Sequence, residues 1–214
     1  MLTARLAHLC HSAALLVLMA ACGGPDAESP AVPASTPEKA ESTESPEPEI
    51  VVLHIKERGD IRIELYPEHA PKHVENFLKL ARSEYYTGTR FHRVIPEFMI
   101  LGGDRLSMDE DPTNDGTGSP GYALEPEANP LRHETGIVGM ARRDDGTSDG
   151  SQFYIMLADN PTWKRVMDGR YTAFGRVIEG MDVAFAIGDV ERDGTDAPLE
   201  PQEIERVSLS LATE

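Results

Sequence analysis

Short runs in which hydrophobic and polar residues alternate dominate the chain from residue 50 onward. The first two runs, IVVLHIKE and DIRIELY, flank Arg58-Gly59 and predict a β-hairpin, because successive side chains of a strand point to opposite faces. Four later segments, TGIVGMAR, SQFYIML, TAFGRVI and QEIERVSLSL, predict further short strands. The inward-facing residues of the hairpin are expected to be Leu53, Ile55, Ile61, Ile63 and Leu65.

Two other segments have helical spacing. In APKHVENFLKLARSEYY, Pro71 suits the first turn of a helix, and apolar residues recur at i, i+3, i+4 and i+7. GMDVAFAIGD predicts a second, shorter helix that ends at Gly188. Many short strands with only two helices favour a mainly β, antiparallel barrel or sandwich over a parallel sheet.

The segment FHRVIPEFMILGGD, residues 91–104, is interpreted as a strand that contains one unexplained charge. Arg93 lies among apolar residues, and an unpaired buried charge is costly. It therefore needs either a chemical role or a distant acidic partner. Gly102-Gly103 predicts a turn, because the Lys-Ser/Thr pair of a phosphate-binding loop is absent.

The N-terminus is typical of an export signal. Arg5 precedes an apolar run from Ala13 to Ala21, which is far shorter than the roughly 20 residues needed to span a bilayer. The run ends in LMAAC, which resembles the lipobox of bacterial lipoproteins, and this resemblance implies cleavage before Cys22 and its acylation. An ordinary secretory signal, cut after Ala21 to leave a free thiol, is the alternative.

The next segment is predicted to be a disordered linker. It is rich in Pro, Glu and Ser, and Val32 is its single large apolar residue, so it cannot bury enough surface to offset its ordering entropy. The predicted organisation is a lipoprotein-type signal peptide (1–21), acylated Cys22 with the linker (22–49) and one folded domain (50–214). We expect an extracytoplasmic protein, lipid-anchored to a bacterial membrane and facing the periplasm.

Charge and cysteine content exclude several function classes. The net charge of −17 argues against nucleic-acid binding. The two cysteines both lie near the N-terminus, so the domain has neither a disulfide framework nor a cysteine-based metal site. The acidic residues of segment 109–115 do not have EF-hand spacing, and we interpret them as a solvated loop in preference to a calcium site.

Six segments in order are similar to the cyclophilins, the peptidyl-prolyl isomerases, from about Ile50 to Leu211. They are FHRVIPEFMILGGD, GTGSPGYALEPE, GIVGMAR, GSQFYIML, DGRYTAFGRVIEGMDV and PLEPQEIERV. The resemblance implies a closed eight-stranded antiparallel β-barrel capped by two α-helices. It also implies isomerase activity without cofactor or metal, acting as a monomer on proline-containing peptides and on unfolded or exported proteins.

The resemblance assigns Arg93 as the catalytic residue. Rotation about an X-Pro bond crosses a barrier of about 18–20 kcal/mol that arises from amide resonance, and no bond is broken. A donor aimed at the prolyl nitrogen favours the twisted amide, and arginine offers fixed, permanently charged donors. The matching substrate-binding positions are Phe98, Met99, Tyr154 and Met167 for the apolar pocket, Gln152 for the substrate backbone, Ala141 and Arg142 for the groove, and Tyr171, where many eukaryotic members have His.

Two positions depart from the family pattern. Leu101 stands where the family usually has a Gln that orients the arginine, so Arg93 is expected to be held either by other groups or less firmly, and Leu101→Gln is expected to raise turnover. The pocket-edge tryptophan of drug-sensitive members maps to Val166, while Trp163 lies three residues too early, which argues against high cyclosporin affinity. A weakly active or inactive chaperone that binds proline-containing segments is the alternative function.

Two hypotheses concern neighbouring charged or titratable residues. Isomerisation needs no net proton transfer, so His92 is interpreted as a hydrogen-bonded structural residue and not as an acid or base. Arg142-Arg143 is expected to favour acidic residues before proline, unless Asp144 and Asp145 simply balance the pair.

Overall fold

Residues 49–211 form a mainly β domain in the computed structural model. The predicted signal peptide, Cys22 and the predicted linker up to residue 48 lie outside the described residues. Within the described part, nine strands form one sheet: β1 (Glu49–Ile55), β2 (Gly59–Leu65), β3 (Arg93–Ile95), β4 (Met99–Gly102), β5 (Ala123–Leu124), β6 (Ile137–Arg142), β7 (Ser148–Met156), β8 (Ala173–Glu179) and β9 (Ile204–Leu211). The helices are α1 (Pro71–Arg82), α2 (Pro161–Met167) and α3 (Met181–Gly188), with a 3₁₀ helix at Arg105–Met108.

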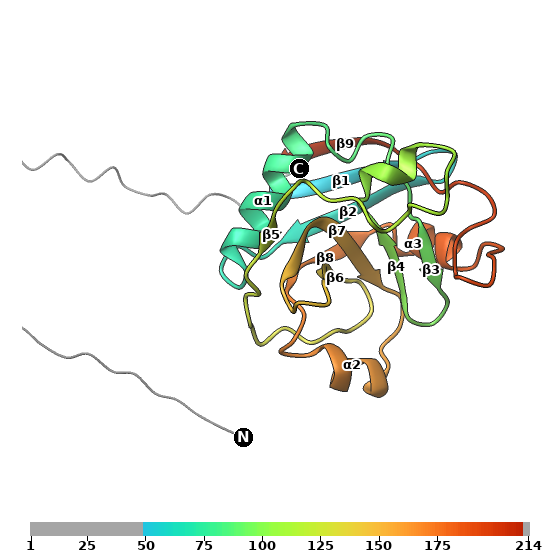
Figure 1. Ribbon diagram of the computed structural model, residues 1–214. Helices are drawn as coiled ribbons and strands as arrows, with labels where there is room; N and C mark the ends of the chain where they lie inside the picture. Colours follow the sequence, from blue (N-terminus) through green and yellow to red (C-terminus); the bar gives the residue numbers. More distant parts are fainter. Residues whose placement is uncertain (1–48, 212–214) are drawn as a thin grey trace, which may run out of the picture. The chain divides into compact units, whose positions relative to one another are not determined.

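All strand pairs are antiparallel, and the sheet order is β3-β4-β7-β6-β8-β2-β1-β9, with β5 added beside β7 (Figure 1). The hairpin predicted at the start of the domain is confirmed as β1 and β2. Its expected inward-facing residues are all buried, and they form the main core with Phe77, Phe153 and Phe174.

The expected closed barrel is not present as a continuous ladder. The two end strands, β3 and β9, do not pair, and only an isolated bridge between Arg90 and Glu203 joins the ends of the sheet. Its hydrogen bonds run from Phe91 N to the Gln202 carbonyl and from Ile204 N to the Thr89 carbonyl. Extension toward β3 would oppose Pro201, which has no N–H to donate, so the ladder stops there.

The strand predicted over residues 91–104 is in fact a hairpin, β3 and β4. Pro96 and Glu97 form the turn, where Glu97 has a φ of 58° and Phe98 N donates to the Ile95 carbonyl at 3.1 Å. The correction matters for the site, because the turn brings Arg93 opposite Leu101 on the paired strand.

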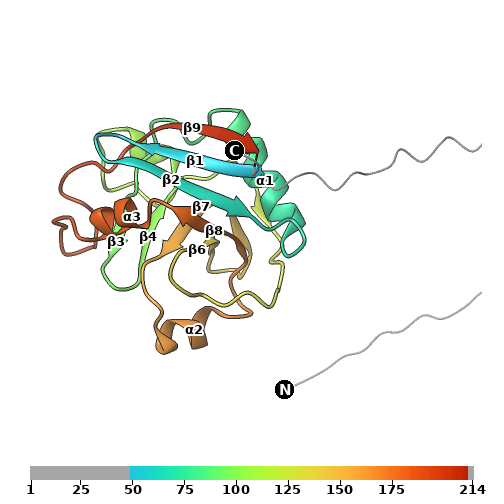
Figure 2. The same ribbon diagram turned by 180° about the vertical axis from the view of Figure 1, so that it is seen from behind.

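Three α-helices replace the two that were expected. The helix predicted after the first hairpin is α1, which ends at Arg82, and the predicted shorter helix is α3. The additional helix α2 begins with Asn160, whose side chain accepts a hydrogen bond from Thr162 N at 2.8 Å, and with Pro161 in its first turn. Both views show α2 at the end of the domain opposite β1 and β9 (Figures 1 and 2).

Among residues 49–211, no helix has both the length and the apolar character that a bilayer span requires.

Candidate active site

The strand register places one row of residues across β3, β4, β7 and β6. Arg93 pairs with Leu101, Leu101 with Tyr154, and Tyr154 with Gly139. Neighbouring strands lie about 4.8 Å apart, so these residues form a short line across the sheet. The adjacent row points to the opposite face and is buried in the main core: Val94, Ile100, Ile155 and Val138.

The face that carries Leu101 and Tyr154 is covered by a second, smaller apolar cluster. Its buried members are Ile137, Tyr154, Met156, Met167 and Ala173, and the partly buried residues that pack on them are Phe98, Met99, Leu101, Leu131, Trp163 and Tyr171. Helix α2 supplies Trp163 and Met167, so the helix that the sequence did not predict forms one wall of the site.

A cavity of about 300 Å³ opens on this cluster. All the predicted site residues of the domain except Gln152 line it. The lining is Arg93, Phe98, Met99, Leu101, Ala141, Arg142, Tyr154, Trp163, Val166, Met167 and Tyr171. The other lining residues are mostly apolar. Arg93 and Arg142 are the two cations among them, and both are exposed at the rim of the cavity.

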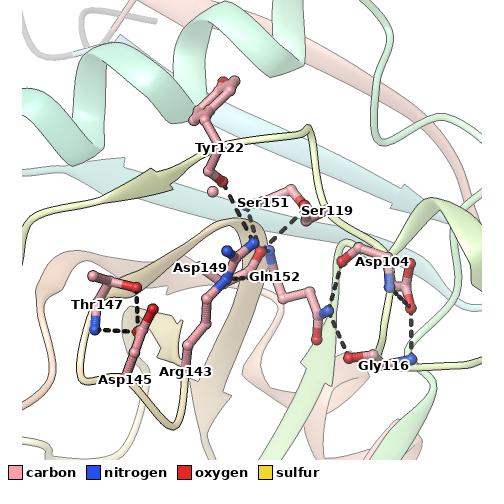
Figure 3. A network of polar contacts seen from close by, with 12 residues as sticks. Asp104, Gly116, Ser119, Tyr122, Arg143, Asp145, Thr147, Asp149, Ser151 and Gln152 are labelled. Atoms are coloured by element: carbon pink, nitrogen blue, oxygen red, sulfur yellow. Dashed lines mark hydrogen bonds and ion pairs between the residues drawn. The ribbon is translucent and has the colours of Figure 1, made fainter.

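Gln152 lines an adjoining cavity of about 310 Å³, which shares Arg93 and Leu101 with the first. The Gln152 side-chain nitrogen donates to the Gly116 and Gly118 carbonyls, at 2.9 and 2.8 Å. Both amide hydrogens are therefore occupied in holding the 116–118 segment, and only the amide oxygen is left for other contacts (Figure 3).

Two buried carboxylates fix the surroundings of Gln152 (Figure 3). Asp149 accepts hydrogen bonds from the Ser151 and Gln152 N–H groups at 2.8 and 2.9 Å. Asp104 accepts from the N–H groups of Gly116 and Gly118, at 2.5 and 3.2 Å. Asp104 and Gln152 therefore both hold the 116–118 segment, while Asp149 fixes the backbone of β7 at Gln152.

Arg93 is not the buried charge that its apolar neighbours in the sequence suggested. Its side chain is 47% exposed, and Nη2 donates to Asp196 Oδ2 at 3.3 Å. The distant acidic partner that was weighed as an alternative therefore exists. An exposed pair of this kind contributes about 1 kcal/mol or less to stability. The remaining N–H groups of the Arg93 guanidinium have no hydrogen-bond partner within residues 49–211.

Tyr154 forms the floor of the cavity, and its hydroxyl is anchored from below. The hydroxyl lies 2.7 Å from His133 Nε2, and His133 Nδ1 lies 2.9 Å from Asp168 Oδ1. A carboxylate only accepts, so Nδ1 carries the proton and Nε2 accepts from the phenol. Burial lowers the pKa of His133, against the opposite influence of Asp168, and burial raises the pKa of Tyr154 well above its ordinary value. Gly139 leaves the room that the phenol occupies, since a Cβ there would collide with it.

Trp163 is a cavity residue that the sequence reasoning set aside. Its ring stacks on Phe98, with centroids 3.9 Å apart and planes 17° from parallel. Its position three residues before Val166 was counted against it, yet one helical turn of α2 places both side chains at the same cavity. The Asn-Pro pair before it was the local signal for this helix.

The two adjacent arginines have different surroundings. Arg143 Nε lies 3.1 Å from Asp149 Oδ2, so its close ion pair is with the buried Asp149, while Asp145 interacts with both arginines at longer range. Arg142 donates to the Gly146 carbonyl at 3.1 Å and lines the cavity. Of the two, only Arg142 lines the cavity.

His92 differs from the hydrogen-bonded histidine that was expected. It is buried, and neither ring nitrogen has a hydrogen-bond partner of good geometry among residues 49–211. Burial lowers its pKa, against the opposite effects of Asp104 and the Arg90 backbone. Burial therefore favours the neutral ring over the charged one, although both ring nitrogens lack a partner among residues 49–211.

The acidic loop 109–115 uses its carboxylates for turns. Asp109 accepts from Asp111 N at 2.8 Å, and Asp111 accepts from the backbone and hydroxyl of Thr113. Within residues 49–211, no group of three or more His, Cys, Asp or Glu side chains is arranged to hold a metal ion.

An antiparallel sheet with an apolar cavity on one face and an arginine among its lining residues has space for a small apolar group next to a hydrogen-bond donor. The sequence matches the family model "Cyclophilin type peptidyl-prolyl cis-trans isomerase/CLD" over residues 50–209. Peptidyl-prolyl cis-trans isomerase ppi1 of Schizosaccharomyces pombe is 44% identical over 151 residues, which cover 68% of this chain and 90% of that protein.

Two solved structures are also similar. A cyclophilin-type isomerase of Cryptosporidium parvum, crystallised in the presence of the dipeptide Ala-Pro, has a TM-score of 0.65 and 30% identity, covering 75% of this chain and 98% of that one. Cyclophilin AquaCyp293 of Hirschia baltica has a TM-score of 0.59 and 25% identity, covering 74% and 73%. The chain belongs to the cyclophilin-type peptidyl-prolyl cis-trans isomerase family, and it is an enzyme of that class.

Proposed function

We propose that this isomerase catalyses X-Pro rotation in exported polypeptides by donating a hydrogen bond from Arg93 to the twisted prolyl nitrogen. As the amide twists, its nitrogen loses conjugation and gains a lone pair, while the planar amide offers no such acceptor. A donor that meets only the twisted form lowers the barrier. The observation that carries this proposal is the position of Arg93 at the rim of the apolar cavity, with guanidinium donors not engaged by Asp196.

The apolar end of the cavity is proposed to hold the proline ring. Phe98, Met99 and Met167 line it, and Tyr154 closes its floor. A ring held there on one side of the amide bond leaves the preceding residue free to turn past Arg93. The Cryptosporidium parvum relative was crystallised with Ala-Pro, which supports a proline-containing ligand for the corresponding cavity here.

The remaining site residues are proposed to hold the peptide beside the proline. Ala141, Arg142 and Tyr171 line the same cavity and would contact the residue before proline and its backbone. Gln152 acts from the adjoining cavity, and its occupied amide hydrogens leave the oxygen to accept from a peptide N–H. Because Arg142 lines the cavity and has no close ion pair among the described residues, with Asp145 acting on it only at longer range, it is the arginine that would favour acidic residues before proline.

A protease-coupled assay on an Ala-Pro peptide tests the catalytic proposal. The wild-type protein is expected to accelerate isomerisation, and Arg93→Ala to lose about 100-fold or more of kcat/KM. Arg170→Ala is a matched control. This exposed arginine is close in sequence to Met167 and Tyr171, which line the cavity, but it does not line the cavity itself. If wild type and Arg93→Ala both proceed at the uncatalysed rate, the binding-module alternative is favoured, in which Leu101 in place of Gln leaves capture without catalysis.

Cys22 is proposed to anchor the enzyme to a bacterial membrane, facing the periplasm. The support is the LMAAC segment and the Pro/Glu/Ser-rich residues that follow it, which lie before the described domain. Intact-mass measurement of the protein isolated from membranes tests this: an acylated N-terminal cysteine is expected. A mature chain with an unmodified cysteine, or a retained signal, would contradict the anchor.

A further inference from the structure

The loop between α3 and β9 runs beside β3 in both views (Figures 1 and 2), and its contacts with the strand are at Arg93 and Val94. Val94 N donates to the Asp196 carbonyl at 2.8 Å, which fixes the loop to the strand edge. From the same residue, the Asp196 carboxylate reaches the Arg93 guanidinium at 3.3 Å. Thr195 and Ala197, on either side, line the cavity that Arg93 shares with Gln152.

The backbone conformation of the loop on both sides of Asp196 is held by hydrogen bonds to Asp193. Asp193 Oδ1 accepts from Thr195 N, Thr195 Oγ1 and Ala197 N, at 2.7, 2.7 and 3.1 Å. Asp196 has a φ of 69°, a left-handed conformation that is uncommon for a residue other than glycine. Its second oxygen, Oδ1, lies 3.5 Å from Arg192 Nε, so the carboxylate stands between two guanidinium groups.

Among residues 49–211, no side chain of the sheet forms a hydrogen bond with the Arg93 guanidinium. Leu101, its register partner on β4, offers only methyl groups. A half-exposed arginine without a partner would sample several rotamers, and a catalytic donor that is loosely held lowers the rate. Because the guanidinium is planar, a hydrogen bond at Nη2 restricts the directions in which its other donors can point.

We propose that Asp196 is the positioning residue for Arg93 and takes the orienting role that Leu101 cannot perform. This inference rests on the proposed role of Arg93 as catalytic donor. It also changes the expectation for Leu101→Gln: with Asp196 present, the added amide is expected to change turnover little.

Steady-state kinetics on an Ala-Pro peptide, by the protease-coupled assay, test the proposal. Asp196→Ala is expected to lower kcat about tenfold with KM little changed, because the apolar cavity is intact. Asp196→Asn, which keeps one acceptor oxygen, is expected to lose less. Asp196→Ala/Leu101→Gln is expected to recover most of the lost kcat, since the new amide oxygen lies opposite Arg93. A loss of loop structure alone would not be repaired by a substitution on β4.

Glu191→Ala is the matched control, because it removes the same charge from the same loop without a contact to Arg93. It should retain the wild-type kcat. A kcat for Asp196→Ala equal to wild type, or a double variant no faster than Asp196→Ala, overturns the inference. Arg93→Ala is measured beside them: if it retains full activity, the proposed role of Arg93 fails, whereas a slow Arg93→Ala with a normal Asp196→Ala rejects only the role of Asp196.

Discussion

At the residue scale, the cavity depends on side chains that are themselves held by others. Tyr154 is the clearest case, because its hydroxyl donates to a histidine that is 1% exposed and paired with Asp168. Removing the hydroxyl leaves the buried Nε2 of His133 without its donor.

Tyr154→Phe is therefore expected to lower the free energy of unfolding by about 1–3 kcal/mol. Urea denaturation measures the change. Tyr171→Phe is the control: it removes a hydroxyl from the same cavity, from a partly exposed ring that has no hydrogen bond within the described residues. Equal effects of the two substitutions would contradict the role given to the His133 contact.

Trp163 provides a direct probe of occupancy, because it is the chain's single tryptophan and stacks on Phe98 at the cavity. Titration with an Ala-Pro peptide is expected to change its fluorescence in a saturable way. The Phe98→Ala variant should show weaker binding, since it removes the stacked wall. Emission that stays unchanged at peptide concentrations that saturate the kinetics would place the ligand elsewhere.

The residues of the site were predictable to different degrees, for physical reasons. Arg93 and most of the apolar wall residues belong to sequence motifs that occur in a fixed order along the chain, and the structure brings them together. Asp196 lies about a hundred positions from Arg93 and carries no local signal, because a single aspartate in a polar loop is common. His133 is similarly hidden, since its partners come from β7 and from the end of α2.

At the scale of elements, α1 is capped by a residue from a distant loop. Helix N-termini leave N–H groups without partners, and Ala70 supplies no side-chain cap. Glu127 accepts instead from Lys72 N at 3.2 Å and His73 N at 3.0 Å, and its carboxylate also lies 2.6 Å from His73 Nδ1.

Glu127→Ala is expected to destabilise the domain by about 2 kcal/mol, because it removes the cap and strands a buried histidine. Thermal unfolding followed by circular dichroism measures the loss. Glu125→Ala, two residues earlier and exposed, is the matched control. If both substitutions lower the melting temperature equally, the cap is not the cause.

The elements that could be predicted were those with a long local pattern. The first hairpin and α1 had clear periodicity, and their buried faces are the expected ones. Helix α2 has only seven residues, too few for periodicity to be distinctive. The break between β3 and β4 depends on Pro96 and on a left-handed Glu97, and the open end of the ladder depends on Pro201 opposing His92. Such breaks result from tertiary pairing, which no single segment specifies.

At the scale of the whole molecule, the three histidines that are buried among residues 49–211 couple stability to pH. His73, His92 and His133 all have pKa values lowered by burial. In the unfolded chain each binds a proton near pH 6.5. Below that pH the unfolded state therefore holds more protons than the folded state, so stability falls as pH falls.

Urea unfolding at about pH 7.5 and about pH 5.5 checks this, with a smaller free energy of unfolding expected at the lower pH. Both pH values lie above those at which most carboxylates titrate. His92→Asn should reduce the difference between the two conditions, because it removes one of the three groups. Stability that is equal or greater at the lower pH would contradict the assignment of these rings as neutral.

The proposed catalysis requires that Arg93 stabilises the twisted amide, in addition to any part it has in capturing the peptide. Nuclear magnetic resonance exchange between the cis and trans forms of an Ala-Pro peptide, with Trp163 fluorescence on the same samples, separates the two. Arg93→Ala is expected to bind the peptide within a few-fold of wild type but to lose about 100-fold or more of the exchange rate. An Arg93→Ala variant that exchanges the peptide as fast as wild type, with equal affinity, would contradict the account.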